Sequence, residues 1–374
     1  MRLLASVTFM NAERELTHFK GTDYGLPRSF AALHKSQTLV IFPKAVDFPH
    51  LNRVQPRIVP FKKEKGTERT FRPAFVFSLT GINTYTCAKL TRRNPNNFGN
   101  EAADQTDKQL QAQELAPTRY ARGYRTDGEG DYIEHTLSEL AFGDLVDVNR
   151  IQFKLSESDG LDILEDLTRA LLTVHQMGNV HGDVKPDNLL LVWKERWRGK
   201  LNDFGHTCPI ARYLPYCGTP AYFSPEQVRA CIRGNLVEDP ISCDLYGLGS
   251  IAYYISMGDR FPWSLTLEEL LTMWVKQENL KTLLEKKEDS REELTARIDN
   301  LQEGIETLYA HYQEAFAAFS YEEDLDSEPF ESLWRNLLHP DPKARMTLEE
   351  VLTWIQKNRL SQAPNEMTRQ TSEE

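Results

Sequence analysis

Apolar and polar residues alternate in several short runs near the start of the chain, a pattern typical of strands. Residues 75–79 and 84–90 form two such runs, and the turn-like segment between them predicts a β-hairpin. Runs at 119–124 and 132–138 predict two further strands. The mildly apolar residues 1–10 show no clear cleavage-site pattern, and we interpret them as another strand.

Helical spacing of apolar residues appears between and after these runs. Residues 157–177 predict an amphipathic helix, and Gly178 suits its C-terminal stop. A shorter helix is predicted over 101–115, ending before Pro117, because the residue that precedes a proline disfavours the α region. Beyond residue 180 the pattern is mainly helical.

A charged segment at 264–316 has apolar residues at alternating steps of four and three, which predicts a two-helix or coiled-coil-like seam. The residues of this seam are Leu294, Ile298, Leu301, Ile305 and Leu308. Two interpretations stay open: a helical insertion packed on the core, or an arm that docks a partner. Residues 361–374 are polar, and we expect a disordered tail there.

Composition narrows the class of protein. The 374 residues are 40% hydrophobic, enough for two domains or one two-lobed unit with a sizeable core. The net charge of −11 argues against a dedicated nucleic-acid binder. No run approaches the roughly 18 uncharged apolar residues of a membrane span. The 5 scattered cysteines form no CxxC pair, so we expect idle thiols in a reducing, cytoplasmic compartment.

One local patch has the opposite charge. Between Arg53 and Arg72 stand seven cationic side chains (Arg53, Arg57, Lys62, Lys63, Lys65, Arg69, Arg72) and two acidic ones. A solvated loop is one interpretation. The others are contact with ATP phosphates, an acidic substrate, or a regulatory polyanion such as an inositol phosphate or phosphoinositide headgroup.

The strongest chemical signal lies in the middle of the chain. Asp183, Lys185 and Asn188 follow one another closely, and Asp203 comes fifteen residues after Asn188. Two carboxylates, a lysine and an asparagine at this spacing can hold a magnesium–nucleotide and deprotonate a hydroxyl.

These residues belong to three ordered motifs. His181–Asn188, Asn202–Gly205 and Gly218–Glu226 resemble the catalytic loop, the Asp-Phe-Gly motif and the Ala-Pro-Glu motif of eukaryotic-type Ser/Thr protein kinases. The resemblance implies an α+β, two-lobed fold with a small, mainly antiparallel β N-lobe that carries one helix and a larger helical C-lobe. The implied division is an N-terminal extension at 1–50 packed on the small lobe, an N-lobe at 51–138, a C-lobe at 139–360 with a helical insertion at about 264–330, and a flexible tail at 361–374.

The resemblance also implies roles for the large-lobe residues. Asp183 would be the catalytic base, and Lys185 would touch the γ-phosphate, which favours serine or threonine substrates. Asn188 and Asp203 would bind Mg²⁺ or Mn²⁺. Asp244 resembles the buried aspartate that braces the catalytic loop.

The resemblance also implies a structural pair between Glu226 and Arg345, because residues 339–345 resemble the last arginine motif of the kinase domain. A buried carboxylate such as that of Glu226 requires such a counter-charge.

In the small lobe, Ala88-Lys89 resembles the strand whose lysine grips the ATP phosphates. We favour Glu114 as the acid that pairs with Lys89, because glutamate reaches farther than the alternative, Asp107.

The segment from Glu139 to Ala141 resembles the hinge that meets the adenine edge, with Ser138 as gatekeeper. Leu190 and Ala88 would then sandwich the base.

Two departures from the family pattern change the expected regulation. No GxGxxG precedes Lys89, so side-chain charges of residues 62–69 would replace backbone amides over the phosphates. Gly182 stands where the family usually has the arginine that binds a loop phosphate. We therefore expect activity that is constitutive or ligand-controlled, without a main switch at Thr207, Tyr213 or Thr219.

Two other functions stay open: a pseudokinase scaffold, and a small-molecule phosphotransferase of the choline- or aminoglycoside-kinase type. The odd small lobe and helical insertion resemble those of translocated bacterial effector kinases. That origin would place the protein in the host cytosol, with peripheral membrane contact conceivable.

Overall fold

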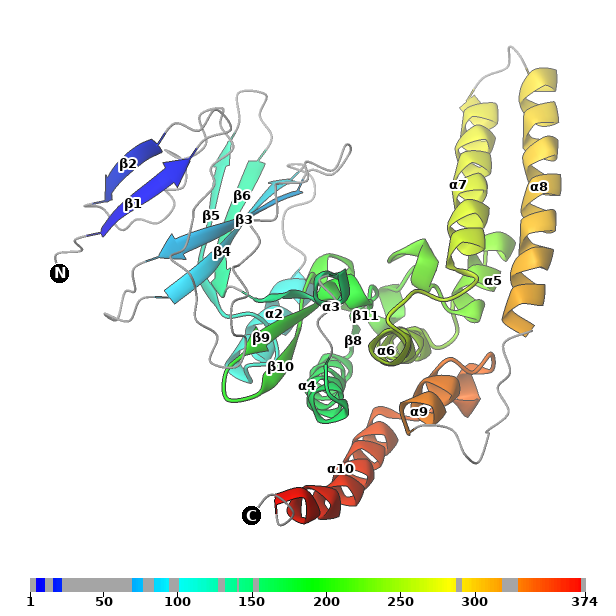
Figure 1. Ribbon diagram of the computed structural model, residues 1–374. Helices are drawn as coiled ribbons and strands as arrows, with labels where there is room; N and C mark the ends of the chain where they lie inside the picture. Colours follow the sequence, from blue (N-terminus) through cyan, green and yellow to red (C-terminus); the bar gives the residue numbers. More distant parts are fainter. Residues whose placement is uncertain are drawn as a thin grey trace. The chain divides into compact units, whose positions relative to one another are not determined.

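The computed structural model describes residues 5–10, 16–21, 69–76, 84–93, 101–126, 132–139, 141–150, 155–286, 291–317 and 329–370. The chain forms two compact units (Figure 1). The first comprises residues 1–144 and 190–202, and the second comprises residues 145–189 and 203–374.

The first unit contains an antiparallel sheet of four strands in the order β3-β4-β6-β5. Its strands are β3 (Arg69–Val76), β4 (Thr84–Arg93), β5 (Arg119–Thr126) and β6 (Tyr132–Glu139). The predicted hairpin is confirmed, and its first strand begins earlier than predicted, at Arg69. β1 (Ala5–Met10) confirms the strand expected at the chain start and pairs with β2 (Leu16–Gly21).

Among the described residues of the first unit, one helix is present, α2 (Glu101–Ala112), and it ends sooner than the sequence predicted. The amide of Leu115 donates to the carbonyl of Leu110 (2.8 Å), and Glu114 adopts a left-handed backbone with φ of 59°. This is the Schellman arrangement, in which a residue just past the helix turns the chain away. Leu110 and Leu115 are both buried. Apolar contact across the helix end therefore stops α2, before Pro117 could act.

A three-stranded sheet in the order β10-β9-β7 completes the first unit. Its strands are β7 (Gly143–Asp144), β9 (Leu189–Trp193) and β10 (Trp197–Leu201). The amide of Leu201 also donates to the carbonyl of Leu115 at 2.9 Å. These bonds group residues 139–144 and 190–202 with the first unit, whereas the sequence predicted a boundary between residues 138 and 139.

The second unit is mainly helical, which confirms the α+β fold class. Its helices are α3 (Leu145–Arg150), α4 (Glu157–Gln176), α5 (Pro225–Arg233), α6 (Pro240–Met257), α7 (Ser264–Lys286), α8 (Arg291–Ala317), α9 (Pro329–Leu337) and α10 (Leu348–Gln370). A short antiparallel pair joins β8 (Asn179–Val180) to β11 (Cys208–Pro209).

The prediction for α4 is confirmed at both ends. Ser156 forms a capping box with Asp159, which satisfies amides at the helix start. Gly178, with φ of 73°, follows the C-terminal residue and takes the left-handed conformation that glycine adopts without strain. The apolar face of α4 is fully buried.

The C-terminal helix differs from the sequence prediction. α10 continues to Gln370, whereas we expected a disordered tail from residue 361. The polar composition of residues 361–370 suggested disorder, but polar residues such as Gln362, Glu366 and Arg369 are also compatible with a helix. Residues 371–374 lie outside the described part of the chain.

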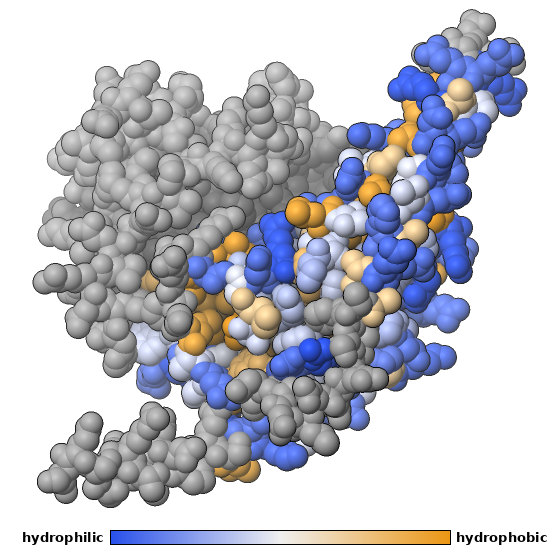
Figure 2. Space-filling view, turned by 45° about the vertical axis from the view of Figure 1, so that its right-hand side comes forward, coloured by the Kyte–Doolittle hydropathy of each residue, from blue (hydrophilic) through white to orange (hydrophobic). Residues whose placement is uncertain are grey.

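The predicted two-helix seam is confirmed by α7 and α8, which lie side by side as an antiparallel pair (Figure 1). Leu294 and Ile305 are buried, and the Gln277 amide donates to the carbonyl of Ile298 (3.3 Å). Hydrophobic side chains are interspersed among hydrophilic ones along this pair of helices (Figure 2). Among the described helices, none is long and apolar enough to cross a membrane.

Candidate active site

The loop between β8 and β9 is held by one buried carboxylate. Asp244, near the start of α6, is 2% exposed and accepts the amides of His181 (2.8 Å) and Gly182 (3.0 Å). It also lies 2.9 Å from the Nε2 atom of His175. Burial alone would raise the pKa of Asp244, but the hydrogen bond and charge of His175 outweigh it and hold the pKa below its usual value. The prediction that Asp244 braces this loop is confirmed.

The same loop packs directly on the backbone of α6. A Cβ atom at Gly247 would lie 2.6 Å from the Cβ of Val184, closer than real contacts allow. Only glycine therefore permits this approach, and the contact sets the distance between the loop and α6.

Asp183 is the centre of a compact polar cluster. Its Oδ2 atom accepts from the Lys185 amine (2.9 Å) and the Asn188 amide (2.9 Å), and its Oδ1 atom accepts from the Thr219 hydroxyl (2.8 Å). The Asn188 amide also donates to the Asp183 carbonyl at 2.8 Å. The Lys185 amine in turn donates to the Thr219 hydroxyl. Asp183 is 8% exposed, so its carboxylate is oriented before any substrate arrives.

The contact of Thr219 with Asp183 is the feature of this cluster that sequence reasoning missed. We considered Thr219 as a phosphorylation site and as part of the run Gly218-Thr219-Pro220, which resembles the peptide-binding loop of Ser/Thr kinases. The structure brings its hydroxyl to Asp183 across 36 residues of sequence.

Asp203 begins a short 3-10 turn, Phe204–His206, in a strained backbone conformation. Its φ of 60° is left-handed, a region that aspartate tolerates better than most residues, and its carboxylate accepts the Gly205 amide at 3.4 Å. Phe204 packs edge-on against His181, with ring centroids 5.4 Å apart. The Asp203 backbone is therefore anchored beside the same loop that carries Asp183.

Asn188 and Asp203 fit the requirements of a divalent cation. Both amide contacts of Asn188 go to Asp183, which leaves its side-chain oxygen as the atom for a metal. Amide and carboxylate oxygens are the donors that Mg²⁺ prefers, and Mg²⁺ usually takes few protein ligands because it keeps waters or substrate phosphates. Within the described part of the chain, no cluster of three or more His, Cys, Asp or Glu residues is arranged as metal ligands.

The segment that follows Asp203 ends in a buried ion pair. Both oxygens of Glu226 accept from the Arg345 guanidinium, at 2.6 and 2.9 Å. Arg345 also donates to the carbonyls of Ser242 (2.8 Å) and His339 (2.9 Å). Burial alone would raise the pKa of Glu226, but the bonds and charge of Arg345 outweigh it and lower the pKa. The predicted pairing is confirmed.

In the first unit, Ala88 and Lys89 lie on the central strand β4. Lys89 stands opposite Phe71 and Thr136, and Ala88 stands opposite Arg72 and Leu137. The side chains of this strand are outside what the structure describes.

The prediction that Glu114 belongs to the helix is wrong. Its carboxylate is exposed and pairs with Lys194 (2.9 Å) and Arg198 (3.8 Å). The hydrogen bond and charge of Lys194 lower the pKa of Glu114. The buried acid of α2 is Asp107, which pairs with Arg119. The structure therefore removes the reason for preferring Glu114 as the partner of Lys89.

Of the expected hinge residues, Glu139 ends β6 and Ala141 lies in the connection just before β7. The Glu139 amide donates to the carbonyl of Thr118 (2.8 Å), and Ala141 is half-buried. Leu190 on β9 pairs with Asp144 on β7.

A buried ion pair near this hinge was not predicted. The Lys200 side chain is 0% exposed, and its amine donates to the Glu139 carboxylate at 2.6 Å. A lysine in a strand is usually solvated, so its sequence position carries no signal of burial.

Replacing Asp244 with asparagine should lower the free energy of unfolding by about 1–3 kcal/mol, because a buried backbone amide loses its acceptor. Asparagine supplies one oxygen, whereas the amides of His181 and Gly182 use both oxygens of Asp244. Urea unfolding would measure this loss, with Asp299→Asn on the exposed face of α8 as the matched control. Equal stability of the two variants would contradict the bracing role.

Comparison with known proteins places these residues in a family pattern. The family model described as a protein kinase domain matches residues 131–354, more than half of the chain. The matched region includes Asp183, Asn188 and Asp203 but begins after β4, so it leaves out Lys89.

Two similar proteins from Drosophila simulans and Drosophila melanogaster are both named serine/threonine-protein kinases. They are 33% and 32% identical to this chain over 126 residues. Each alignment covers 33% of this chain and 16% of the relative, so the chain aligns with about a sixth of the length of these relatives.

Proposed function

This chain belongs to the protein kinase family, and we propose that it transfers the γ-phosphoryl group of ATP to serine or threonine hydroxyls of protein substrates. The observation that carries this proposal is the buried Asp183 carboxylate, fixed by Lys185 on one oxygen and by Thr219 on the other. Phosphoryl transfer depends mainly on positioning and charge neutralisation, and this cluster supplies both.

In the proposed reaction the substrate hydroxyl donates its proton to Asp183 as its oxygen forms a bond to the γ-phosphorus. The bond between the γ-phosphorus and the β–γ bridging oxygen breaks, and ADP leaves with that electron pair. The Lys185 amine lies 2.9 Å from the Asp183 carboxylate, where its charge can also stabilise negative charge on the transferring phosphoryl group. A bound Mg²⁺ or Mn²⁺ would neutralise phosphate charge, held by Asn188 and Asp203.

The remaining nucleotide contacts are carried over from the family resemblance. We assign the ATP phosphates to Lys89, the adenine edge to the backbone of Glu139 and Ala141, and the faces of the base to Ala88 and Leu190. For the acid that pairs with Lys89 the contacts described above favour no candidate.

Regulation is the second part of the proposal. Gly182 supplies no cation for a loop phosphate, so activity would be constitutive or set by another ligand. An inositol phosphate or phosphoinositide headgroup at the cationic stretch Arg53–Arg72 is our candidate, on charge alone. Residues 53–68 of that stretch lie outside the described residues.

Location follows from the same resemblance. A translocated bacterial effector would act in the cytosol of its host cell, and the cationic stretch would then offer a peripheral contact with anionic membranes. An endogenous kinase with this composition would act in the cytoplasm.

A labelling assay tests the proposal. The full chain is incubated with γ-labelled or α-labelled ATP, a generic protein substrate, and Mg²⁺ or Mn²⁺. We expect label only from the γ-phosphate, on serine and threonine, with none from Asp183→Ala and parent-like transfer from Asp299→Ala. Running the same assay with and without inositol hexakisphosphate tests the regulatory part.

Each other outcome points away from this function. Equal labelling by the parent and Asp183→Ala would remove the kinase assignment. Nucleotide binding without transfer would favour a pseudokinase scaffold. Label in small metabolites but not in protein would favour a small-molecule phosphotransferase.

A further inference from the structure

The segment from Asp203 to Glu226 contacts the catalytic loop at several points, and one of them is the ring of Tyr213. Gly182, next to Asp183, has φ of 76°, and a Cβ atom there would lie 3.0 Å from the His206 carbonyl oxygen and 3.5 Å from the Tyr213 ring. A side chain at position 182 would therefore meet the His206 backbone first, with the Tyr213 ring at van der Waals distance. Gly182 thus lies in direct contact range of the Tyr213 ring.

Tyr213 is buried in a small apolar cluster that belongs to the second unit. The ring is 5% exposed, whereas Tyr216, three residues later, is 56% exposed. The cluster consists of Val180, Tyr213, Ala230, Val237 and Cys243. Because the cluster includes residues of β8, α5 and α6, the ring joins the segment to three regular elements.

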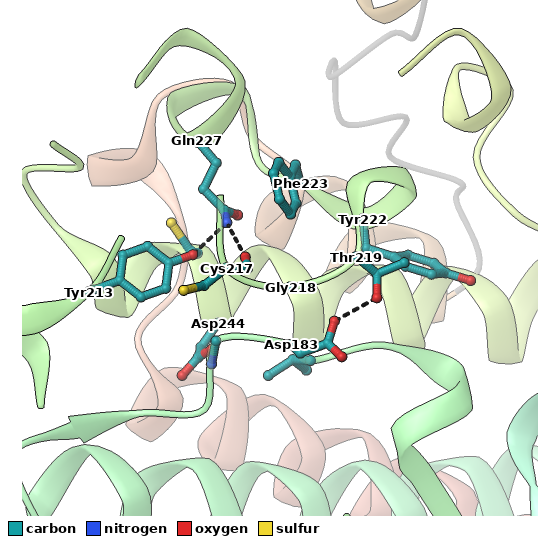
Figure 3. A pocket seen from close by; sticks show the side chains of 12 residues that line it. Asp183, Tyr213, Cys217, Gly218, Thr219, Tyr222, Phe223, Gln227 and Asp244 are labelled. Atoms are coloured by element: carbon teal, nitrogen blue, oxygen red, sulfur yellow. Dashed lines mark hydrogen bonds between the residues drawn. The ribbon is translucent and has the colours of Figure 1, made fainter. Parts of the chain in front are cut away.

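A single glutamine ties the same stretch to the start of α5. The Gln227 amide nitrogen donates to the Tyr213 hydroxyl and to the carbonyl of Cys217 (3.3 Å) (Figure 3). It also lies within hydrogen-bond distance of the Pro215 carbonyl (3.5 Å). Its amide oxygen accepts the Ser224 amide (3.2 Å) within the capping box of α5. Gln227 is 4% exposed, so these bonds are shielded from water. Hydrogen bonds are stronger in the protein interior than in water.

The backbone after Tyr213 then reaches the catalytic aspartate. Gly218, with φ of 105°, would place a Cβ atom 2.6 Å from the Gly182 carbonyl oxygen, so only glycine allows this approach. The next residue, Thr219, donates to Asp183 at 2.8 Å (Figure 3). Along the segment, the Tyr213 ring contacts Gly182 first, and the Gly218 backbone then contacts Gly182 again. The Thr219 hydroxyl finally binds Asp183.

Hydroxyl groups of this segment are poorly placed for modification. Thr207, Tyr213, Tyr222 and Ser224 are each at least nine-tenths buried, and the Thr219 hydroxyl is bound to Asp183. Burial also raises the pKa of Tyr213 well above its usual value. The structure describes all of residues 203–226. Among the Ser, Thr and Tyr residues of this segment, only Tyr216 is exposed.

We infer that Tyr213 is a positioning residue that anchors the activation segment on the catalytic loop and thereby holds Thr219 against Asp183 without a phosphate. This inference rests on the proposed kinase function. In switchable kinases a new arginine–phosphate pair orders this segment. Here an inserted ring and the Gln227 bonds give order that is already present in the unmodified chain.

Hydrogen exchange of residues 204–224 in the full chain tests the anchor without any assay of activity. Tyr213→Ala should raise amide exchange there by about tenfold or more, because truncating a buried aromatic side chain removes several kcal/mol of packing that opposes local opening. Tyr213→Phe keeps the ring and should rescue most of the protection. Tyr216→Ala is the matched control and should exchange like the parent.

Kinetics distinguish a positioning role from a merely structural one, because only loss of positioning should lower kcat while leaving the KM for ATP unchanged. Tyr213→Ala should lower kcat by about tenfold or more and leave the KM for ATP within about twofold of the parent, since the loss concerns the geometry around Asp183. Phosphatase treatment of the parent should leave its rate unchanged. If Tyr213→Ala does not fold, Tyr213→Leu, which retains apolar volume, should show the same pattern in weaker form.

Parent-like exchange and kcat in Tyr213→Ala or Tyr213→Leu would overturn the inference, as would loss of activity after phosphatase treatment. Failure of the proposed function gives a different result. In that case the parent transfers no phosphate, and the exchange measurements still report whether Tyr213 anchors the segment.

Discussion

An Asp183→Asn variant should transfer phosphate about 10²- to 10⁴-fold more slowly than the parent, the range that a positioned general base contributes. Asparagine has nearly the same size as aspartate but cannot accept the substrate proton. It also presents an amide group to Lys185 or Thr219, each of which donates to Asp183 in the parent. Steady-state kinetics with a protein substrate would measure the change in kcat.

The binding of ATP separates this chemical effect from a loss of structure. The dissociation constant of ATP, measured by calorimetry, should stay within about threefold of the parent, because the base acts on the hydroxyl proton and not on the nucleotide. Asp299→Asn on α8 is the control for loss of an aspartate as such. A kcat within tenfold of the parent would rule out Asp183 as the base.

Local chemistry made much of this site predictable. Asp183, Lys185 and Asn188 are close in sequence and lie in one tight loop, and their spacing together with the two later motifs indicates that they act together. Asp244 and Arg345 are distant in sequence from their partners. Asp244 accepts backbone amides of the loop, and Arg345 neutralises the buried carboxylate of Glu226.

The missed features depend on packing between distant segments. The end of α2 at Ala112 depends on Leu115 folding back on Leu110, which overrides the local signal of Pro117. Burial of Lys200 depends on its partner Glu139, 61 residues away. In both cases the residue type alone points to the opposite outcome.

The role of Tyr213 shows the same limit for function. Sequence reasoning identified the missing arginine at position 182 but treated Tyr213 only as a hydroxyl that could be phosphorylated. The structure shows that Gly182 lies within contact range of the Tyr213 ring. A substitution at one site of a packed pair can be interpreted only when the other member is known.

Replacing Arg345 with methionine should lower the free energy of unfolding by about 3–5 kcal/mol, the usual result of leaving a buried charge without its partner. The Arg345 side chain is 0% exposed, and its guanidinium meets both oxygens of Glu226. Methionine has a similar length but offers no donor. Urea unfolding at neutral pH would measure the loss.

The stability lost in Arg345→Met should depend on pH in a definite direction. In the parent, Arg345 lowers the pKa of Glu226, so the pair stabilises the fold above the unfolded pKa, and this contribution is lost as the pH falls through the folded value. In the variant, burial without a counter-charge would raise the pKa of Glu226, so the fold would lose stability as the pH rises. The difference between parent and variant should therefore shrink between neutral pH and pH 5.

Two further variants isolate the ion pair from the loss of arginine itself. Glu226→Gln combined with Arg345→Met should recover part of the stability, since the carboxylate that lost its partner is then absent. Arg260→Met removes an exposed arginine that pairs with Glu268 at 3.4 Å, and it should change stability by less than about 1 kcal/mol. If the double variant is no more stable than Arg345→Met, the loss comes from the bonds of Arg345 to the Ser242 and His339 carbonyls, and the charge on Glu226 does not matter.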